Sequence, residues 1–263
     1  MSETPSDGLE ARLAALEEAH QNLLGDFKHL RNFFYRQHFY THRLLEKAFQ
    51  VACFGDYLEF GVFEGASMIQ SYNASKRIFQ LMEDGHWDAG SAEVDKKESY
   101  REAWEKMRFI GFDTFEGMPT LNEIDATYDM FEEGSFVTTL DKCRTNISKA
   151  GVPEKQFQLV KGRFEESLNE QTSSDLNLKA VSIVNIDCDL YSSALKALEF
   201  VTPYLQDGSI IIFDEWYHYK GNPSLGEQRA FHEWKAKNPQ LILNEFHKEG
   251  PYRNSFIVTT KTY

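Results

Sequence analysis

Four acidic residues in the second half of the chain have the spacing of a divalent-cation site. Asp187 and Asp189 follow one apolar segment, and Asp214 and Glu215 follow the next. The first and third lie 27 positions apart, the length of one strand–helix–strand unit, so parallel strands would bring all four to one edge of a sheet. Carboxylates gathered there repel one another unless a cation neutralises them. Because oxygen ligands favour Mg2+, Mn2+ or Ca2+ over zinc, we predict that Asp187, Asp214 and Glu215 bind Mg2+ or Mn2+.

Such a site suits the activation of a hydroxyl group. A cation lowers the pKa of a bound hydroxyl and orients it, and a neighbouring carboxylate then accepts the proton. Asp189 is the predicted base, because Asp187 is already assigned to the metal. His218, three positions after Glu215, is a second catalytic candidate, with an ordinary surface histidine as the alternative. The aromatic run Trp216–Tyr219 is expected to shape an acceptor pocket, with at least one of its rings in the core.

A second group of candidate residues lies at the ends of two earlier apolar segments. The first segment carries Glu59 and ends in a turn with Gly61 and Gly65, where a missing side chain lets a ligand approach the backbone. The second ends in Asp113, which can accept hydrogen bonds from both hydroxyls of a ribose or can cap its own turn. Glu59 would hold a cationic amino group. The turn lacks the GxGxxG pattern, which disfavours a dinucleotide.

These residues need a sheet to position them. Apolar segments of strand length alternate with helical segments, which predicts an α/β fold, a Rossmann-like sheet with helices on both faces. A short turn joins the last two strands, so the sheet is expected to be mostly parallel with one antiparallel C-terminal strand. The expected strands are 57–61, 109–113, 156–161, 180–186, 210–213, 241–246 and 255–260.

Four helical segments are expected between these strands. The first follows the first strand and its turn, and carries Ile69, Tyr72, Phe79 and Leu81. A charged stretch at about 84–108, helical near its end, is predicted to be an insertion or a lid. A helix is expected to end at Ala150, before Gly151. Ser192 is expected to cap a further helix that runs toward Gly208.

The N-terminal segment 9–34 carries apolar residues at alternating spacings of four and three, broken by His20. This heptad pattern predicts a long helix, either a dimerising coiled coil or a helix packed on its own domain. The expected organisation is therefore a helical extension over 1–50 and one domain over 51–263. A homodimer or a higher homo-oligomer is expected.

Composition narrows the classes of partner. The net charge of -13 argues against nucleic acid and against an anionic membrane surface. The three cysteines lack a CxxC spacing and fit unpaired thiols in a reducing compartment. No apolar signal segment follows the polar N-terminus, so a cytoplasmic protein is expected.

Five segments in order along the chain carry a resemblance to a known family. They are EFGVFEG (59–65), GFDTFEGMP (111–119), KGRFEESL (161–168), IDCDLYSS (186–193) and IIFDEW (211–216). Together they resemble the macrocin O-methyltransferase (TylF-like) family, whose members are metal-dependent class I methyltransferases. GFDTFEGMP is the most specific of them, because no fold alone requires such an aromatic and acidic string.

The resemblance implies transfer of a methyl group from S-adenosylmethionine to a hydroxyl of a sugar or small natural product, with a divalent metal. The family's metal ligands match Asp187, Asp214 and Glu215, and its proposed base matches Asp189. Asp187 is also assigned to the cofactor site. Gly65, in the turn after the first strand, is assigned to it as well. The remaining implied cofactor contacts are Glu59, Gly61, Ser67, Asp113 and, beside the adenine, Gly162, Arg163 and Phe164.

The chain departs from the family where Asp214–Glu215 replaces the usual Asp-Asp, and where Asp207-Gly208-Ser209 replaces a Gly-Gly. Residues 89–108 have no counterpart in the family. Three other functions remain open from the sequence. The DxD at Asp187 would also suit a metal-dependent glycosyltransferase or a phosphohydrolase, and a non-catalytic protein could keep the cofactor fold.

Overall fold

The structure is a computed structural model that divides into two compact units, residues 1–39 and 40–263. In the first unit the described residues Arg12, Leu16, Glu17, Ala19 and His20 are helical and exposed. The other residues of the expected heptad segment lie outside the described part of the chain, so its self-association stays a prediction. The described residues are 12, 16–17, 19–20, 44–45, 47–49, 51, 53–83, 95–121, 123–127 and 131–260.

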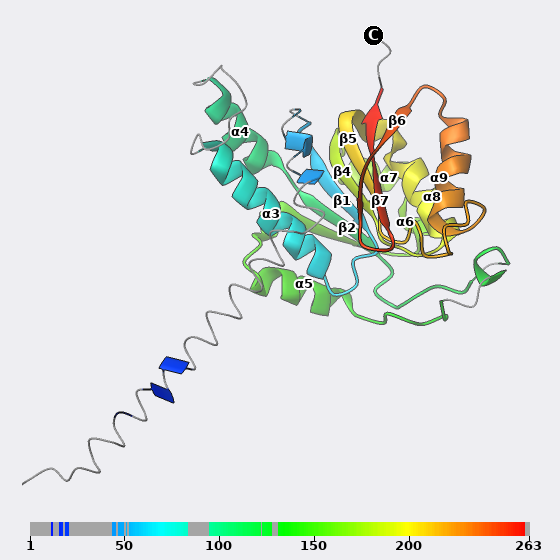
Figure 1. Cartoon of the computed structure of the whole chain (residues 1–263), viewed down its shortest axis with the longest axis horizontal. Helices are drawn as coiled ribbons and strands as arrows, with labels where there is room; N and C mark the ends of the chain where they lie inside the picture. The colour runs from blue at the N-terminus through cyan, green and yellow to red at the C-terminus, as the bar shows by residue number, and fades with distance from the viewer. Residues whose placement is uncertain are drawn as a thin grey trace, which may run out of the picture. The chain divides into compact units, whose positions relative to one another are not determined.

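The second unit is built on a seven-stranded sheet (Figure 1). The strand order is β3-β2-β1-β4-β5-β7-β6, and β7 is antiparallel to both of its neighbours while the pairs among β1 to β5 are parallel. The predicted α/β sheet with one antiparallel C-terminal strand is therefore confirmed. The strands are β1 (Asp56–Phe60), β2 (Phe109–Asp113), β3 (Phe157–Lys161), β4 (Val181–Ile186), β5 (Leu205–Phe213), β6 (Ile242–Glu249) and β7 (Arg253–Thr259).

Helices cover the two faces of the sheet, with α3, α4 and α5 on one face and α6, α8 and α9 on the other (Figure 1). Alternation along a strand divides the core in the same way, because Leu58 and Phe60 pack toward α8 while Tyr57 packs toward α3. The helices are α3 (Ala66–Glu83), α4 (Asp95–Lys106), α5 (Leu140–Lys149), α6 (Phe164–Ser167), α7 (Glu170–Asp175), α8 (Tyr191–Val201) and α9 (Gly226–Lys237).

Two segments near the α3 face bear on the expected domain organisation. Leu44 and Phe49, assigned to the extension from sequence, are buried in this core, and the Phe49 and Phe79 rings lie 4.5 Å apart. Helix α4 confirms the helix expected near the end of the charged stretch. Its Trp104 ring lies 5.4 Å from that of Tyr72 in α3, so this helix packs on the domain. Residues 84–94 lie outside the described part of the chain.

The helix after β4 differs from its prediction at both ends. Ser192 does not cap it, because the helix begins at Tyr191 after Leu190, which makes no side-chain cap bond. Asp125, distant in sequence, accepts hydrogen bonds from the Tyr191 amide at 2.8 Å and from the Ser192 hydroxyl at 2.6 Å. The helix also ends at Val201, because a 3-10 turn with a proline follows and β5 already starts at Leu205.

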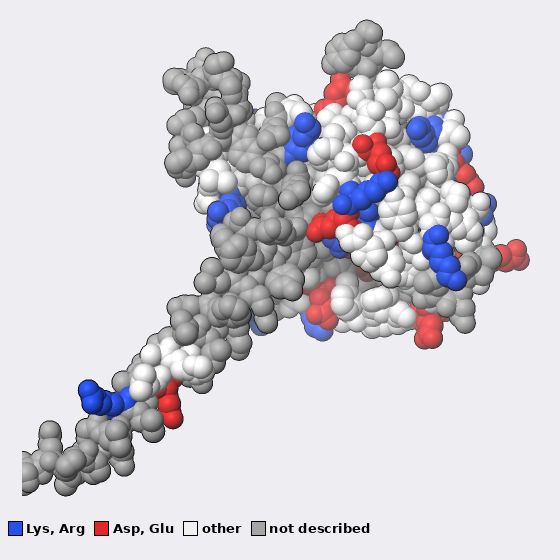
Figure 2. All heavy atoms as spheres, in the orientation of Figure 1, with Lys and Arg blue, Asp and Glu red and all other residues white. Residues whose placement is uncertain are grey.

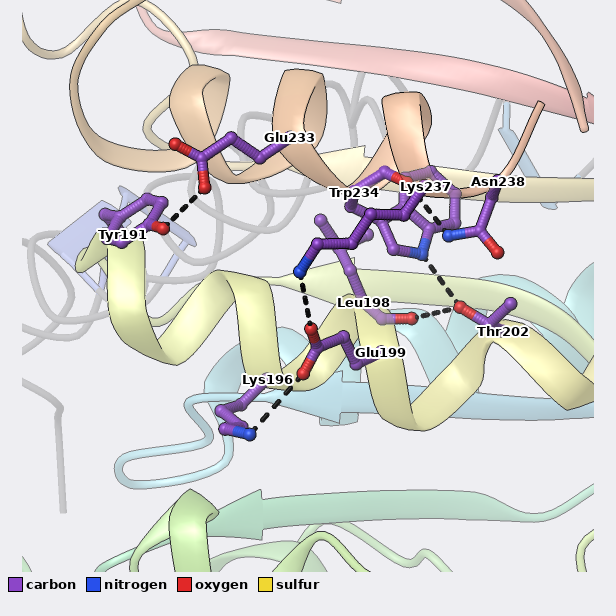
Figure 3. A network of polar contacts seen from close by, with 9 residues as sticks. All are labelled: Tyr191, Lys196, Leu198, Glu199, Thr202, Glu233, Trp234, Lys237 and Asn238. Atoms are coloured by element: carbon purple, nitrogen blue, oxygen red, sulfur yellow. Dashed lines mark hydrogen bonds and ion pairs between the residues drawn. The ribbon is translucent and has the colours of Figure 1, made fainter.

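Helices α8 and α9 are joined by a network of polar contacts (Figure 3). The Tyr191 hydroxyl donates to Glu233 at 2.6 Å. The fully buried Trp234 donates its indole N–H to the Thr202 hydroxyl at 2.8 Å, and that hydroxyl donates to the Leu198 carbonyl at 2.6 Å. Because buried polar groups are satisfied on both helices, α9 is held in one position beside the ends of β4 and β5.

Among the described residues on the face that Figure 2 shows, Lys and Arg are scattered among Asp and Glu and form no continuous basic region. Among the described residues, no helix combines the length and the apolar character needed to cross a membrane.

Candidate active site

The parallel ladder brings the acidic residues together at the carboxyl edge of the sheet. Phe60, Ile186 and Phe213 are register partners on β1, β4 and β5. The next residues continue the ladder, since the Asp187 amide donates to the Phe60 carbonyl at 2.9 Å and the Asp214 amide donates to the Ile186 carbonyl at 3.0 Å. These backbone hydrogen bonds therefore fix the backbone positions from which the Asp187 and Asp214 side chains extend.

Three carboxylates form a cluster with metal-ligand spacing. Asp187, Asp214 and Glu215 each offer an oxygen, and these oxygens all lie within 4.8 Å of one another. Oxygen Oε2 of Glu215 is buried without a hydrogen-bond partner among the described residues. Burial, and then the neighbouring carboxylates, raise the pKa values of Asp187 and Glu215. The Arg253 guanidinium pairs with Asp214 and offsets part of the negative charge. The three carboxylates are oxygen donors, the type of ligand that Mg2+ and Mn2+ prefer, so the donor set fits a divalent cation.

Asp189 lies beside this cluster in a constrained backbone conformation. Its φ is +64°, in the left-handed region that Asp and Asn tolerate better than most residues. Burial and, after it, the charge of Asp214 raise the pKa of Asp189 to about 6, although a hydrogen bond with Glu215 lowers it. A carboxylate with a pKa near neutrality suits a general base.

Glu59 is fully buried on β1. It accepts hydrogen bonds from the Tyr57 hydroxyl and, at 2.5 Å, from the Ser67 hydroxyl, so the structure brings two predicted cofactor residues together. Asn185, its register partner on β4, is a third donor. Burial raises the pKa of Glu59 to about 7, and the charge of Asp214 contributes. The donors are all neutral, so a positive charge would complete this site.

The turn after β1 explains why glycine is needed there. Gly61 has a φ of +89°, and a Cβ atom on it would lie 1.7 Å from the Asp187 carbonyl oxygen. The backbone of the turn therefore lies directly against the loop that carries the predicted ligand and base. Gly65 has a φ of +88° and faces Ile147 and Cys143 of α5, so its need is one of packing.

Asp113 ties this turn to the end of β2. One of its oxygens accepts hydrogen bonds from the Val62 and Phe63 amides, both at 2.8 Å, and the other accepts from the Phe115 amide at 2.7 Å. Asp113 thus caps its own turn, the structural alternative left open from the sequence, and it also accepts hydrogen bonds from the turn after β1. A ribose contact by the same carboxylate stays a prediction.

The turn after β3 adjoins Asp113, because the Gly162 amide donates to the Asp113 carbonyl at 3.0 Å. Arg163 precedes α6 as its N-cap residue. Phe164 is buried, with its ring 5.9 Å from that of Phe60 in an edge-on contact. The Phe164 side chain therefore belongs to the core on the α8 face. The cofactor contacts expected of Gly162, Arg163 and Phe164 stay predictions.

The aromatic run after β5 is only partly buried. Trp216 and Tyr219 are buried, which confirms that at least one of these rings packs in the core. His218 is half-buried between two aromatic rings, with its centroid 5.2 Å from that of Phe131 and 5.0 Å from that of Tyr252. The ring contacts of His218 within the described part of the chain are with Phe131, Tyr219 and Tyr252, and its catalytic role stays a prediction.

The comparisons with known proteins follow this geometry. Residues 73–239, more than half of the chain, match the family described as macrocin-O-methyltransferase (TylF). The chain belongs to the TylF family.

One curated relative of this TylF-family chain comes from Streptomyces olivaceus. It is the 8-demethyl-8-(2,3-dimethoxy-alpha-L-rhamnosyl)-tetracenomycin-C 4'-O-methyltransferase, 28% identical over 142 residues. The match covers 52% of this chain and 52% of the relative, so the chain spans about half the length of the relative that it matches.

Solved structures share the fold. The calicheamicin methyltransferase CalS11 has a TM-score of 0.62 at 20% identity, over 98% of this chain and 94% of its own. The O-methyltransferase NovP has a TM-score of 0.58 at 16% identity, over 83% of this chain and 78% of its own. TomG of Streptomyces achromogenes, solved with SAM, has a TM-score of 0.50 at 15% identity, over 83% of this chain and 79% of its own. These likenesses show that the chain shares its fold with these three O-methyltransferases.

Several site residues of this TylF-family chain were missed from sequence. Tyr57 had a signal, because it lies two positions from Glu59 on one strand and therefore faces the same side. Arg253 and Glu227 had none, since β7 and α9 approach the site only in the folded chain. Glu227 is fully buried, and its Oε2 accepts a hydrogen bond from the Glu215 amide at 3.0 Å.

Proposed function

We propose that the chain is an S-adenosylmethionine-dependent O-methyltransferase that acts, with a divalent cation, on a hydroxyl of a sugar or small natural product. The observation that carries the proposal is the cluster of Asp187, Asp214 and Glu215 oxygens at the carboxyl edge of the sheet. This is the edge at which doubly wound sheets bind their ligands.

The cofactor is assigned to the ends of β1 and β2. Glu59 would bind the amino group of the methionine part, because its buried carboxylate has only neutral donors among the described residues. The Gly61 turn would let the cofactor approach the backbone. The Asp113 carboxylate already accepts three backbone hydrogen bonds. It would accept the hydrogen bonds of the ribose hydroxyls at its remaining acceptor position.

The acceptor hydroxyl is assigned to the space beside the acidic cluster. A divalent cation there would lower the pKa of that hydroxyl and orient it. Transfer of a methyl group to oxygen releases one proton, and Asp189 would accept it. Positioning of the hydroxyl against the methyl group supplies the rest of the rate, because an in-line displacement depends on alignment.

The substrate class rests on the family and on the relative from Streptomyces olivaceus, whose name states a 4'-O-methyltransferase of a rhamnosyl tetracenomycin. A rhamnosyl hydroxyl is a secondary alcohol, which needs help to lose its proton. The cluster and Asp189 would supply that help.

Calorimetry with S-adenosylhomocysteine, with and without Mg2+, tests the cofactor, and transfer of a labelled methyl group to rhamnosylated acceptors tests the reaction. Binding of the cofactor and transfer that EDTA abolishes are expected. Absence of S-adenosylhomocysteine binding would reject the methyltransferase assignment. Full turnover in excess EDTA would reject the role of the cation and leave the methyltransferase assignment standing.

A further inference from the structure

Helix α9 places one more carboxylate behind the proposed cation site. Glu227 is fully buried in the first turn of this helix. Its Oε2 accepts a hydrogen bond from the Glu215 amide at 3.0 Å, while its Oε1 is buried without a hydrogen-bond partner among the described residues. A buried carboxylate with one unpaired oxygen is costly, so its position calls for an explanation.

The start of α9 is fixed on the loop that carries Glu215. Gly226 has a φ of +52°, and a Cβ atom there would lie 2.3 Å from the Tyr219 ring. The Gln228 side chain donates to the Trp216 carbonyl at 2.6 Å. Contacts on both sides of Glu227 thus hold it against the residues that follow β5, and the α8–α9 network of Figure 3 holds the rest of the helix.

Glu227 is not one of the three residues whose oxygens lie within 4.8 Å of one another. It contacts the cluster through the backbone of Glu215, which gives it a role in orientation. The Glu215 amide would otherwise be a buried donor without an acceptor, and the peptide could turn the side chain away from Asp187 and Asp214.

We propose that Glu227 is a positioning residue of the cation site, which fixes the Glu215 peptide through its side-chain oxygen so that the Glu215 carboxylate faces the ion. This inference rests on the proposed function, because it concerns the same ion. The part that acts is the hydrogen-bond acceptor, and outer partners of this kind typically change metal affinity about 10–100-fold.

The two conservative substitutions of Glu227 separate the hydrogen bond from the charge. Glu227→Gln keeps an acceptor oxygen at full length without the charge, and Glu227→Asp keeps the charge but withdraws the oxygen by one methylene. Mn2+ binding to the metal-free full chain, measured by calorimetry, should weaken about 10-fold or more in Glu227→Asp and stay within about 3-fold of wild type in Glu227→Gln. Glu170→Asp is the matched control, because it makes the same shortening at an exposed position in the first turn of α7, away from the residues that follow β5, and it should bind as wild type.

A general weakening of the fold would act on all variants, so a double-mutant cycle supplies the second readout. In a Glu215→Gln background, Glu227→Asp should cause no further loss of Mn2+ affinity, because the ligand that it orients is already changed. If Glu227→Asp does not fold, Glu227→Asn shortens the side chain in the same way and is expected to show the same loss.

The outcomes are distinct. Wild-type affinity in Glu227→Asp, additive losses in the cycle, or equal losses in Glu227→Asp and Glu227→Gln would overturn the positioning role while the cation site stands. If the wild-type chain binds no Mn2+, the cation of the proposed function fails and the inference fails with it.

Discussion

The Glu59 side chain is fully buried. Among the described residues, no basic side chain is bonded to its carboxylate. Tyr57, Ser67 and Asn185 supply hydrogen bonds without a positive charge. Such a group favours its protonated form until a cation arrives. The amino group of a bound cofactor would be that cation, so ligand binding and protonation of Glu59 should be linked.

The stability of the cofactor-free chain should therefore depend on Glu59 and pH. The pKa of Glu59 is raised from 4.5 to about 7. The folded chain binds the extra proton, so the contribution is complete below about 4.5 and is lost as the pH rises through about 7. Urea unfolding at pH 5 to 8 should show the stability of wild type falling relative to Glu59→Gln over this window. Parallel curves would contradict the raised pKa of Glu59. In a separate measurement, the affinity for S-adenosylhomocysteine should rise over the same pH window, because the deprotonated carboxylate binds the amino group.

Asp189 and Asp214 should fail in different ways. Asp214→Asn removes a proposed ligand, so turnover should recover in part with added Mg2+. Asp189→Asn keeps a residue type that tolerates the φ of +64°. It should leave Mn2+ affinity near that of wild type and lower turnover about 10²–10⁴-fold. If excess Mg2+ rescues Asp189→Asn as well, Asp189 supports a ligand through its hydrogen bond with Glu215 and is not the base.

At the scale of elements, the site depends on ties between strand ends. Asp113 joins the turn after β1 to the end of β2, and the Gly61 turn lies against the loop after β4. A cofactor placed along these three strand ends would meet a backbone that is already fixed. Preorganisation of this kind lowers the entropic cost of binding.

Asp113→Ala should therefore act before any cofactor is present. It removes the acceptor of the Val62, Phe63 and Phe115 amides, so the cofactor-free chain should lose about 1–3 kcal/mol of stability and S-adenosylhomocysteine should bind more weakly. Asn169→Ala is the control, because it removes the side-chain acceptor of the Thr172 amide at the start of α7, away from this turn. It should lower the stability without weakening the binding of S-adenosylhomocysteine. A weaker affinity with unchanged stability would mean that Asp113 serves the ribose and not the turn.

The sequence was sufficient for the elements that repeat a local pattern. Alternating apolar segments located the strands, and residues that follow a parallel strand must meet at one edge, which is why Asp187, Asp214 and Glu215 were brought together as predicted. The start of α8 was wrong because Asp125, a residue far away in the chain, accepts the hydrogen bonds of its first turn. Its end was wrong because a 3-10 turn with a proline follows Val201. Glu227 was missed because an acidic residue in the first turn of a helix is common without any site, and because α9 approaches the acidic cluster only in the folded chain.

At the scale of the whole molecule, charge and family membership point to small-molecule chemistry. A net charge of -13 gives little attraction for polyanions. The acidic cluster at the site sharpens this preference, because a neutral sugar hydroxyl meets less repulsion there than a phosphate without its own cation. We therefore expect neutral glycosylated acceptors to be used in preference to anionic ones at the same concentration.

The N-terminal segment is predicted to contribute to self-association. Its apolar residues recur at heptad spacing over 9–34, and Leu16, a member of this pattern, is 67% exposed in the single chain. An exposed apolar seam is stabilised when another helix covers it. Removal of residues 1–35 should leave the catalytic unit folded, because the compact unit begins at Tyr40, and should lower the mass of the assembly in solution. Multi-angle light scattering of both forms measures this, with far-ultraviolet circular dichroism as the control for folding. An unchanged number of chains per assembly would show that the seam packs within its own chain, whereas a loss of association at full helix content in the remaining unit would support the coiled coil.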